Sequence, residues 1–275
     1  MKKTLMALLM TAALGVTACS GSTASPAGNS NGGDQAAQKE TFTRVADLKG
    51  HTIGVQAGTS MGDTVTENIP DAIVSQYRNY TFLVDALKKG EIAAFPADDP
   101  VVKELCNKDS ALTYINEAVD PGDFAFAFPK TDKGDVLLGQ FNEYIAKLES
   151  NGDMQKLIDK WLGADDSVKV VEDYTKFPAN NGTLKFATEG DYAPFDYFRN
   201  DQLVGIDIEL AIGFCKEYGY GLEVTTMSFG DIIPSVWNGN YDFAGAGITV
   251  TDERKEQVNF STPNYTGGIL FCVLK

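Results

Sequence analysis

The feature that most constrains the fold is a strand–helix alternation that runs along the chain twice. The first run starts near residue 47, where an apolar strand over 51–56 leads through a Gly-Thr-Ser turn into a helix. A strand over 184–188 opens the second run, which ends on the apolar strand 269–274. Such alternation predicts α/β sheets with helices on both faces, and these bind ligands at the carboxyl ends of their strands. Two sheets facing each other would form a cleft.

The length suits this arrangement, because 275 residues can supply two lobes of about 100–130 residues each. A hydrophobic fraction of 43% is ordinary for a globular protein and excludes wholesale disorder. Strands are expected over 51–56, 91–95, 111–115, 124–128, 184–188, 222–227, 241–246 and 269–274, and helices over 82–89, 100–108, 136–149, 154–162, 206–218, 231–237 and 252–257.

The charge balance excludes several classes of function. The chain has 23 Lys and Arg against 38 Asp and Glu, a formal net charge of -15. Nucleic-acid binding needs a basic surface, so it is not expected. One histidine and four cysteines argue against a zinc site or a Ser-His-Asp triad. We expect no metal, no cofactor and no catalytic residue, and instead an acidic binding protein.

The first residues predict export and anchoring. Lys2 and Lys3 precede an apolar run over 5–16 that is too short to span a bilayer. The run ends at Val-Thr-Ala-Cys, which resembles a bacterial lipobox with Cys19 as the lipidated mature N-terminus. We expect a signal peptide over 1–18 and a flexible tether over 19–43. The alternative is an ordinary secretory signal with an incidental cysteine.

The other cysteines give no pairing pattern. With Cys19 assigned to lipid, Cys106, Cys215 and Cys272 remain, an odd number without close spacing. The first two lie in helical stretches and the third in an apolar strand. We therefore expect buried free thiols.

Five motifs of the second half resemble one known family. They are Ala-Thr-Glu-Gly-Asp-Tyr-Ala-Pro-Phe (187–195), Val-Gly-Ile-Asp-Ile-Glu-Leu-Ala (204–211), Phe-Gly-Asp-Ile-Ile-Pro (229–234), Ala-Gly-Ala-Gly-Ile-Thr-Val-Thr-Asp-Glu-Arg (244–254) and Asn-Phe-Ser-Thr-Pro (259–263). In this order and spacing they resemble the first lobe of the polar amino-acid-binding proteins of bacterial ABC importers, extracellular solute-binding protein family 3. Segments 47–50, 54–59, 97–100, 126–130 and 151–163 resemble the remainder of that family.

The resemblance implies a two-lobed, periplasmic-binding-protein-like (type II) α/β fold with a ligand cleft between the lobes. Its halves stand in reversed order, since family members begin with the motifs found here after residue 184. The expected fold is therefore circularly permuted, with 164–182 joining the former termini. A truncated tandem array is the alternative.

The permuted order sets the expected domains. We expect the second, smaller lobe over 44–127 and the first, larger lobe over 128–275, with hinge strands over 124–129 and 266–275. Strand 269–274 is expected to lie antiparallel beside 124–128, because an unpaired edge strand would be a liability.

The resemblance also assigns one end of an amino-acid ligand. Arg254 is expected to clamp the α-carboxylate, because a guanidinium fork pairs with two oxygens at once. The backbone N–H groups after Thr59 and Ser60, at a helix N-terminus, would complete the carboxylate site. Asp98 would take the α-ammonium, and the neighbouring Asp99 would be the N-cap of the next helix.

The other site residues follow from the same resemblance. The Gly247 carbonyl and the Thr249 hydroxyl would share the ammonium. Tyr192 and Phe229 would sandwich the ligand side chain. Glu189 would contact its far end, with Gln56 facing it from the other lobe. An acid beside two aromatic rings suits a cationic or amide side chain.

Together these features predict a lipid-anchored, extracytoplasmic protein that delivers a polar or cationic amino acid to the permease of an ABC importer. We expect a monomer that touches the membrane through its lipid alone. One alternative is an enzyme of the same fold, a cyclohexadienyl (arogenate or prephenate) dehydratase, for which Glu189 could serve as the general acid. Another is a ligand-binding sensor module.

Overall fold

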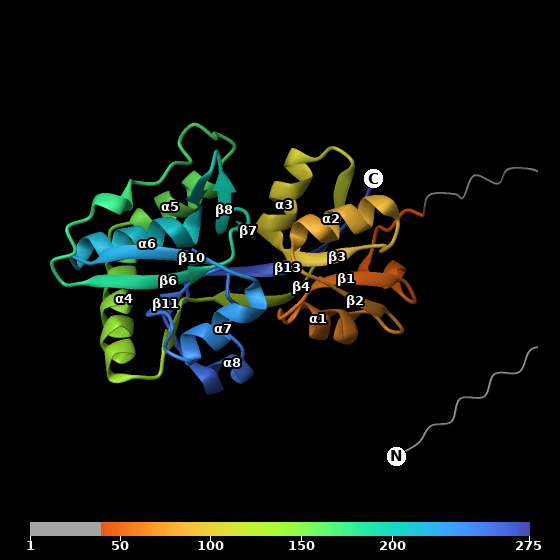
Figure 1. Ribbon diagram of the computed structural model, residues 1–275. Helices are drawn as coiled ribbons and strands as arrows, with labels where there is room; N and C mark the ends of the chain where they lie inside the picture. Colours follow the sequence, from red (N-terminus) through yellow and green to blue (C-terminus); the bar gives the residue numbers. More distant parts are fainter. Residues whose placement is uncertain (1–39) are drawn as a thin grey trace, which may run out of the picture. The chain divides into compact units, whose positions relative to one another are not determined.

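The computed structural model describes residues 40–275, which form one compact unit with two lobes (Figure 1). The predicted signal peptide, the lipid site Cys19 and most of the predicted tether lie outside the described residues. Phe42 is half-buried and its ring centroid lies 5.0 Å from that of His51. The folded chain thus starts before residue 44, the boundary expected from the sequence. In the part described, no helix is long and apolar enough to cross a membrane.

The large lobe is built on a five-stranded sheet with the strand order β10-β6-β11-β5-β12. Its strands are β5 (Ala127–Pro129), β6 (Thr183–Thr188), β10 (Gly221–Thr226), β11 (Phe243–Ala244) and β12 (Val258–Phe260). Its helices are α4 (Asp132–Ser150), α5 (Asp153–Leu162), η2 (Tyr174–Lys176), α6 (Ile206–Glu217), α7 (Phe229–Trp237) and α8 (Asp252–Gln257). A small antiparallel sheet of β7 (Asp191–Tyr192), β8 (Asp196–Arg199) and β9 (Gln202–Val204) faces the other lobe.

The small lobe has a sheet of matching order. A parallel bridge between Ile53 and Ala94 joins the pair β1-β2 to the three strands β3-β13-β4, so the order is β2-β1-β3-β13-β4. The strands are β1 (Thr52–Gln56), β2 (Ile73–Tyr77), β3 (Phe95–Asp98), β4 (Leu112–Phe124) and β13 (Tyr265–Leu274). The helices are η1 (Val45–Leu48), α1 (Met61–Asn68), α2 (Tyr80–Lys89) and α3 (Asp99–Lys108).

The lobes exchange strands. After β4 the chain enters the large lobe as β5, which runs antiparallel between β11 and β12. After β12 it returns to the small lobe as β13, which runs antiparallel between β3 and β4. Each sheet thus has one reversed strand at the same place in its order. The two-lobed α/β fold expected from the sequence is confirmed.

The expected partner of the last strand is wrong. Ile269–Leu274 lies antiparallel to residues 112–119 of β4 and to β3, and only Tyr265 pairs with Phe124. The segment 124–128 is not one strand, because the chain changes sheets at residues 125–126. The two crossings are hydrogen-bonded to each other instead, with Asn264 N–H donating to the Phe124 carbonyl at 2.9 Å.

Most of the other elements agree with the sequence prediction within a few residues. The strand expected over 91–95 is displaced to Phe95–Asp98. Strand β2 and the sheet over 191–204 were not predicted. The alternating phenylalanines do predict burial correctly, since Phe126 and Phe128 pack on Phe141 in the large-lobe core.

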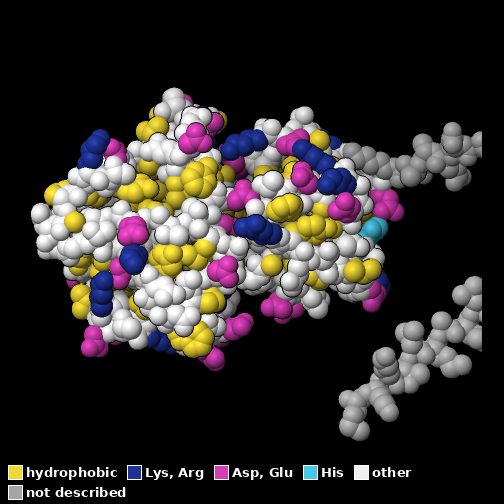
Figure 2. All heavy atoms as spheres, in the orientation of Figure 1, with side chains coloured by type: hydrophobic (Ala, Val, Ile, Leu, Met, Phe, Trp, Pro, Cys, Tyr) yellow, Lys and Arg dark blue, Asp and Glu magenta, His cyan; other side chains and the backbone are white. Residues whose placement is uncertain are grey.

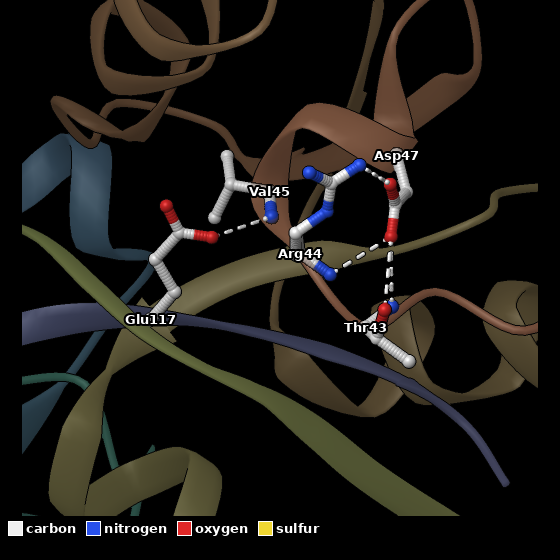
Figure 3. Close-up of polar contacts among 5 residues, drawn as sticks. All are labelled: Thr43, Arg44, Val45, Asp47 and Glu117. Atoms are coloured by element: carbon white, nitrogen blue, oxygen red, sulfur yellow. Dashed lines mark hydrogen bonds and ion pairs between the residues drawn. The ribbon is translucent and has the colours of Figure 1, made fainter.

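Two carboxylates, Asp47 and Glu117, hold the start of the small lobe. Asp47 accepts hydrogen bonds from the N–H groups of Thr43 and Arg44 at 3.1 and 3.0 Å and from the Arg44 guanidinium at 2.9 Å (Figure 3). These bonds, the one from Thr43 first, lower the pKa of Asp47 to about 2. Val45 N–H donates to Glu117 on β4 at 2.9 Å, so η1 is docked on the crossover strand.

Acidic side chains are spread over both lobes on the face that Figure 2 shows, with basic side chains interspersed among them. This distribution agrees with the formal charge of -15.

Candidate functional site

The ten predicted ligand-binding residues surround one narrow cavity of about 10 Å³ between the lobes. Met61 and Tyr80 also line it and were not predicted. The small lobe contributes Gln56, Thr59, Ser60, Met61, Tyr80 and Asp98, and the large lobe contributes Glu189, Tyr192, Phe229, Gly247, Thr249 and Arg254.

The strands position most of these residues. Gln56 and Asp98 are the last residues of β1 and β3, and Glu189 directly follows β6. Phe229 opens the helix that follows β10, and Gly247 follows β11. The cavity therefore lies at the carboxyl ends of strands from both sheets, the place where open α/β sheets bind ligands.

Arg254 is buried beside the cavity, with 9% of its surface exposed. Thr251 caps α8 by accepting a hydrogen bond from Arg254 N–H at 3.2 Å. The guanidinium donates to the carbonyls of Thr249 at 2.8 Å and of Gly58 at 3.2 Å, and lies 5.2 Å from the centre of the Phe229 ring. Among the described residues, no carboxylate forms a salt bridge with it. A buried cation without a counterion is costly, so the site favours an anion here.

The N-terminus of α1 differs from the expectation at one residue. The Thr59 N–H donates to the Gln56 carbonyl at 3.4 Å, and the Thr59 hydroxyl accepts from Met61 N–H at 3.3 Å. The Met61 N–H, one of the two groups expected to complete the carboxylate site, is thus already paired within the turn. Within the described part of the chain, the N–H groups of Ser60 and Gly62 have no acceptor, as is usual in a first helical turn. They are the donors that an anion beside Arg254 could use.

Asp98 is 4% exposed and accepts a hydrogen bond from the Tyr192 hydroxyl across the cavity. Burial raises the pKa of Asp98 to about 7. The predicted N-cap role of Asp99 is wrong. The extended residue before α3 is Asp98, whereas Asp99 is already helical and pairs with Lys103 at 2.5 Å.

Aromatic rings form two walls of the cavity. The Tyr192 ring lies 5.1 Å from Tyr80 and 5.7 Å from Phe195, centroid to centroid. Phe229 lies against the Arg254 guanidinium on the other side. Gly247 has φ +55, and a Cβ there would lie 2.6 Å from the Tyr192 ring, so only glycine fits.

Glu189 and Gln56 meet across the lobes as predicted, with the Gln56 amide donating to the carboxyl group. Burial, and next the charge of Asp191, raise the pKa of Glu189 to about 8. The second carboxyl oxygen of Glu189 is buried and has no partner in the described part of the chain.

Two buried carboxyl groups support the site and were not predicted. Asp196 accepts the N–H groups of Glu189 and Gly190 at 3.1 and 2.5 Å. Asp207 accepts Gly247 N–H at 2.7 Å and the amide of Asn264 at 3.1 Å. Asp207 thereby ties the cavity wall to the crossing between the lobes. The sequence feature that could have identified Asp196 and Asp207 is an acidic residue flanked by apolar residues, which suggests a buried carboxyl group.

No cluster of three or more His, Cys, Asp or Glu side chains suited to a metal ion occurs among residues 40–275. The arrangement is a closed polar cavity with one buried cation and two buried carboxyl groups at its edges. These charges are complementary to a small zwitterion, but the lobes must separate to admit one, because a cavity of about 10 Å³ has room for about one water molecule.

Residues 184–275 match the model of the family described as bacterial extracellular solute-binding proteins, family 3. The arginine-binding extracellular protein ArtP of Bacillus subtilis is 42% identical over 83 residues, 30% of this chain and 32% of the relative. A putative ABC transporter arginine-binding protein 2 of Escherichia coli is 39% identical over 90 residues, 32% and 37% of the two chains.

A solved structure titled as an ancestral arginine-binding protein bound to arginine is 44% identical, with a TM-score of 0.30 over 30% of this chain and 38% of the other. The chain thus spans about a third of the length of these relatives. Residues 184–275 are thus similar to the bacterial extracellular solute-binding proteins, family 3.

Proposed function

We propose that this protein captures a polar or cationic amino acid, L-arginine first, in the interlobe cavity and delivers it to an ABC importer. The observation that carries the proposal is the pair of buried groups at the cavity, Arg254, which has no salt-bridge partner among residues 40–275, and Asp98 opposite it. An α-carboxylate and an α-ammonium would satisfy them together. The names of the relatives, arginine-binding proteins of ABC transporters, agree with this chemistry.

In this proposal the carboxylate lies on Arg254 and on the N–H groups of Ser60 and Gly62. The ammonium lies on Asp98, with the Gly247 carbonyl and the Thr249 hydroxyl beside it. Ligand groups thereby replace the contacts that Arg254 makes with Gly58 and that Asp98 makes with Tyr192.

The ligand side chain extends between the rings of Tyr192 and Phe229 toward Glu189 and Gln56. A guanidinium or ammonium there gains charge-assisted hydrogen bonds from Glu189 and a favourable position over the ring faces. An aspartate or glutamate ligand would meet a like charge, so acidic ligands are disfavoured.

The proposed location is the extracytoplasmic side of the cell membrane, with a monomer anchored by lipid on Cys19. The relatives named as extracellular or periplasmic support export. A Cys19→Ala chain should leave the membrane fraction for the soluble fraction. Retention of that variant in the membrane would refute the anchor.

We also propose that the halves stand in permuted order, with the small lobe completed by β13 rather than ending at residue 127. The reciprocal exchange of β5 and β13 supports this, because both lobes are complete within one chain. Small-angle scattering should show a monomer that compacts when the amino acid is added. A dimer that exchanges β13 would support a truncated tandem instead.

A thermal-shift screen of the twenty amino acids tests the function. Binding stabilises by RT ln(1 + [L]/Kd), about 4 kcal/mol at a thousandfold excess over Kd. Arginine or lysine should give the largest rise in Tm. If no amino acid raised the Tm, the proposal would be wrong.

One observation favours the dehydratase alternative. Glu189 has a pKa near 8 and faces the cavity, so it is protonated at neutral pH as a general acid must be. Incubation with prephenate and with arogenate, followed by product analysis, decides between the two functions. Release of phenylpyruvate or phenylalanine that disappears in Glu189→Gln would establish the enzyme.

A further inference from the structure

Two cysteines meet in the small lobe, away from the cavity. Cys106 lies in the last turn of α3 and Cys272 near the end of β13, and both side chains pack in the same core cluster. Both are free thiols in this structure. An odd number of cysteines, far apart along the chain, does not predict this pair.

The topology brings the two thiols together. Strands β3 and β4 are connected by α3, and β13 lies between them in the sheet, so α3 crosses over β13 (Figure 1). On β13, Leu270 and Cys272 belong to one core cluster, and the alternate residues Ile269, Phe271 and Val273 belong to another. Cys272 therefore points from the face of the sheet that α3 covers.

The face of α3 that meets this strand has helical spacing. Val101, Val102, Leu105 and Cys106 pack in the same cluster as Cys272. Cys106 thus lies on the stripe that faces the sheet, one turn beyond Val102. Two regular elements thus place both cysteines in the packed layer between α3 and the sheet.

The two thiols differ in access. Cys272 is fully buried, whereas Cys106 is half-buried. The interaction with the Cys272 thiol lowers the pKa of Cys106, and the same interaction raises the pKa of Cys272. Cys106 is therefore the thiol that ionises first and that an oxidant reaches first.

We propose that Cys106 and Cys272 form a disulfide bond that joins α3 to β13 when the protein is outside the cytoplasm. The cellular setting rests on the proposed function, since extracytoplasmic compartments are oxidising. The bond itself needs only the two thiols and an oxidant, a small-molecule or protein disulfide.

The reaction is thiol–disulfide exchange. The Cys106 thiolate attacks one sulfur of the oxidant, which forms a mixed disulfide and releases one thiolate. That thiolate takes the proton of Cys272, and the Cys272 thiolate then attacks the Cys106 sulfur and releases the second thiolate. Two protein thiols are oxidised, and one external disulfide is reduced to two thiols.

The bond would fix the small-lobe end of a strand that crosses between the lobes. It would also close a loop of more than 100 residues, and long loops gain the most from a cross-link in the chain-entropy model. Ile269 of β13 pairs with Asp98 in the same sheet, so the cross-link supports the strand that carries the ammonium site without touching the cavity.

The test uses the full chain with Cys19→Ala, which removes the thiol outside the described residues and changes none of those described. After incubation with oxidised glutathione, the intact mass should fall by two hydrogens, and peptide mapping should recover a Cys106–Cys272 link. The Tm should exceed that of the dithiothreitol-reduced protein by on the order of 5–15 °C.

Cys106→Ser, at the half-buried position, should abolish both the mass loss and the gain in Tm, whereas Cys215→Ser should keep both. Two alkylatable thiols at 106 and 272 after oxidation, or a stable glutathione adduct on Cys106, would overturn the proposal. No amino acid is needed in this experiment. A failed ligand screen would leave the disulfide standing, and a missing disulfide would leave the ligand proposal standing.

Discussion

The two sides of the cavity carry opposite charges in different ways. On the large-lobe side, Arg254 is fixed by the Thr251 cap, by the Thr249 carbonyl and by the Phe229 ring. On the small-lobe side, Asp98 has a pKa of about 7 and shares a hydrogen bond with a tyrosine of the opposite lobe. The Arg254 cation is preorganised by the protein, whereas the Asp98 carboxylate gains its counterion only when the ligand ammonium binds. We infer that the large lobe holds the ligand first and that the small lobe closes on it.

Removing the preorganised cation should have the largest effect. Arg254→Ala should weaken binding of the amino acid by about 2–5 kcal/mol, roughly 30- to 3,000-fold, because the ligand carboxylate would stay buried without its partner. Calorimetric titration measures the loss. Lys255→Ala, the exposed neighbour on α8, is the control and should bind normally. Equal affinities for the two variants would refute the carboxylate site.

The carboxyl group on the small-lobe side should come next. Asp98→Asn keeps the shape and removes the charge, and should weaken binding by about 1.5–4 kcal/mol, roughly 10- to 1,000-fold. Asp99→Asn is the matched control, because its side chain pairs with Lys103 outside the cavity. If calorimetric titration showed a larger loss of affinity for Asp99→Asn than for Asp98→Asn, the assignment of the ammonium site to Asp98 would be wrong.

Closure of the lobes can be tested at one glycine. Gly58 has φ +80, and a Cβ there would lie 2.5 Å from the backbone of Gly230 in the opposite lobe. Gly58→Ala should therefore obstruct closure and weaken binding by about 1–3 kcal/mol, roughly 5- to 150-fold.

Gly50→Ala is the control for backbone strain, since Gly50 has φ +75 and a Cβ added there would meet no atom within 4 Å. It should lower the Tm by a similar strain but leave Kd unchanged. If both alanine variants bound as tightly as the wild type, the lobes would not need the approach of Gly58 to Gly230.

The pH dependence of the two carboxyl groups should give the smallest effect. The pKa values of Asp98 and Glu189 are raised to about 7 and about 8, so both groups bind protons in the folded protein that they release when unfolded. The ligand-free protein should therefore lose stability as pH rises from about 4 to about 8. Thermal melts over this range measure the fall.

A cationic ligand needs the ionised carboxylates, so its affinity should rise by about tenfold between pH 6 and pH 8. Glu189→Gln should flatten part of this rise. An affinity for arginine that falls over the same interval would contradict the assigned pKa shifts.

Much of the site could be predicted from the sequence because the motifs fix residues at strand ends. Gln56 and Glu189 lie where the predicted strands stop, Asp98 ends a strand that was predicted a few residues too early, and the fold brings all three ends to one cavity. Tyr80 and Met61 were not predicted as site residues, because each starts a helix and has the sequence pattern of a core residue.

The strand neighbours of β13 and the proximity of Cys106 to Cys272 were not predicted, because both depend on long-range topology. β13 carries apolar residues on both faces, so the sequence shows that it is buried but not which strands flank it. The contact between Cys106 and Cys272 depends on the same insertion of β13 beneath α3. Periodicity identifies such elements, whereas their neighbours in a sheet are set by the exchange between lobes.

The central claim is that Arg254 binds the α-carboxylate of an amino acid, and comparison of L-arginine with agmatine, which lacks that carboxylate, tests it most directly. Calorimetry with the wild type and with Arg254→Ala gives four affinities that form a cycle. We predict that loss of the carboxylate costs at least about 30-fold in the wild type and less than about 3-fold in Arg254→Ala. An equal cost in both proteins would contradict the account.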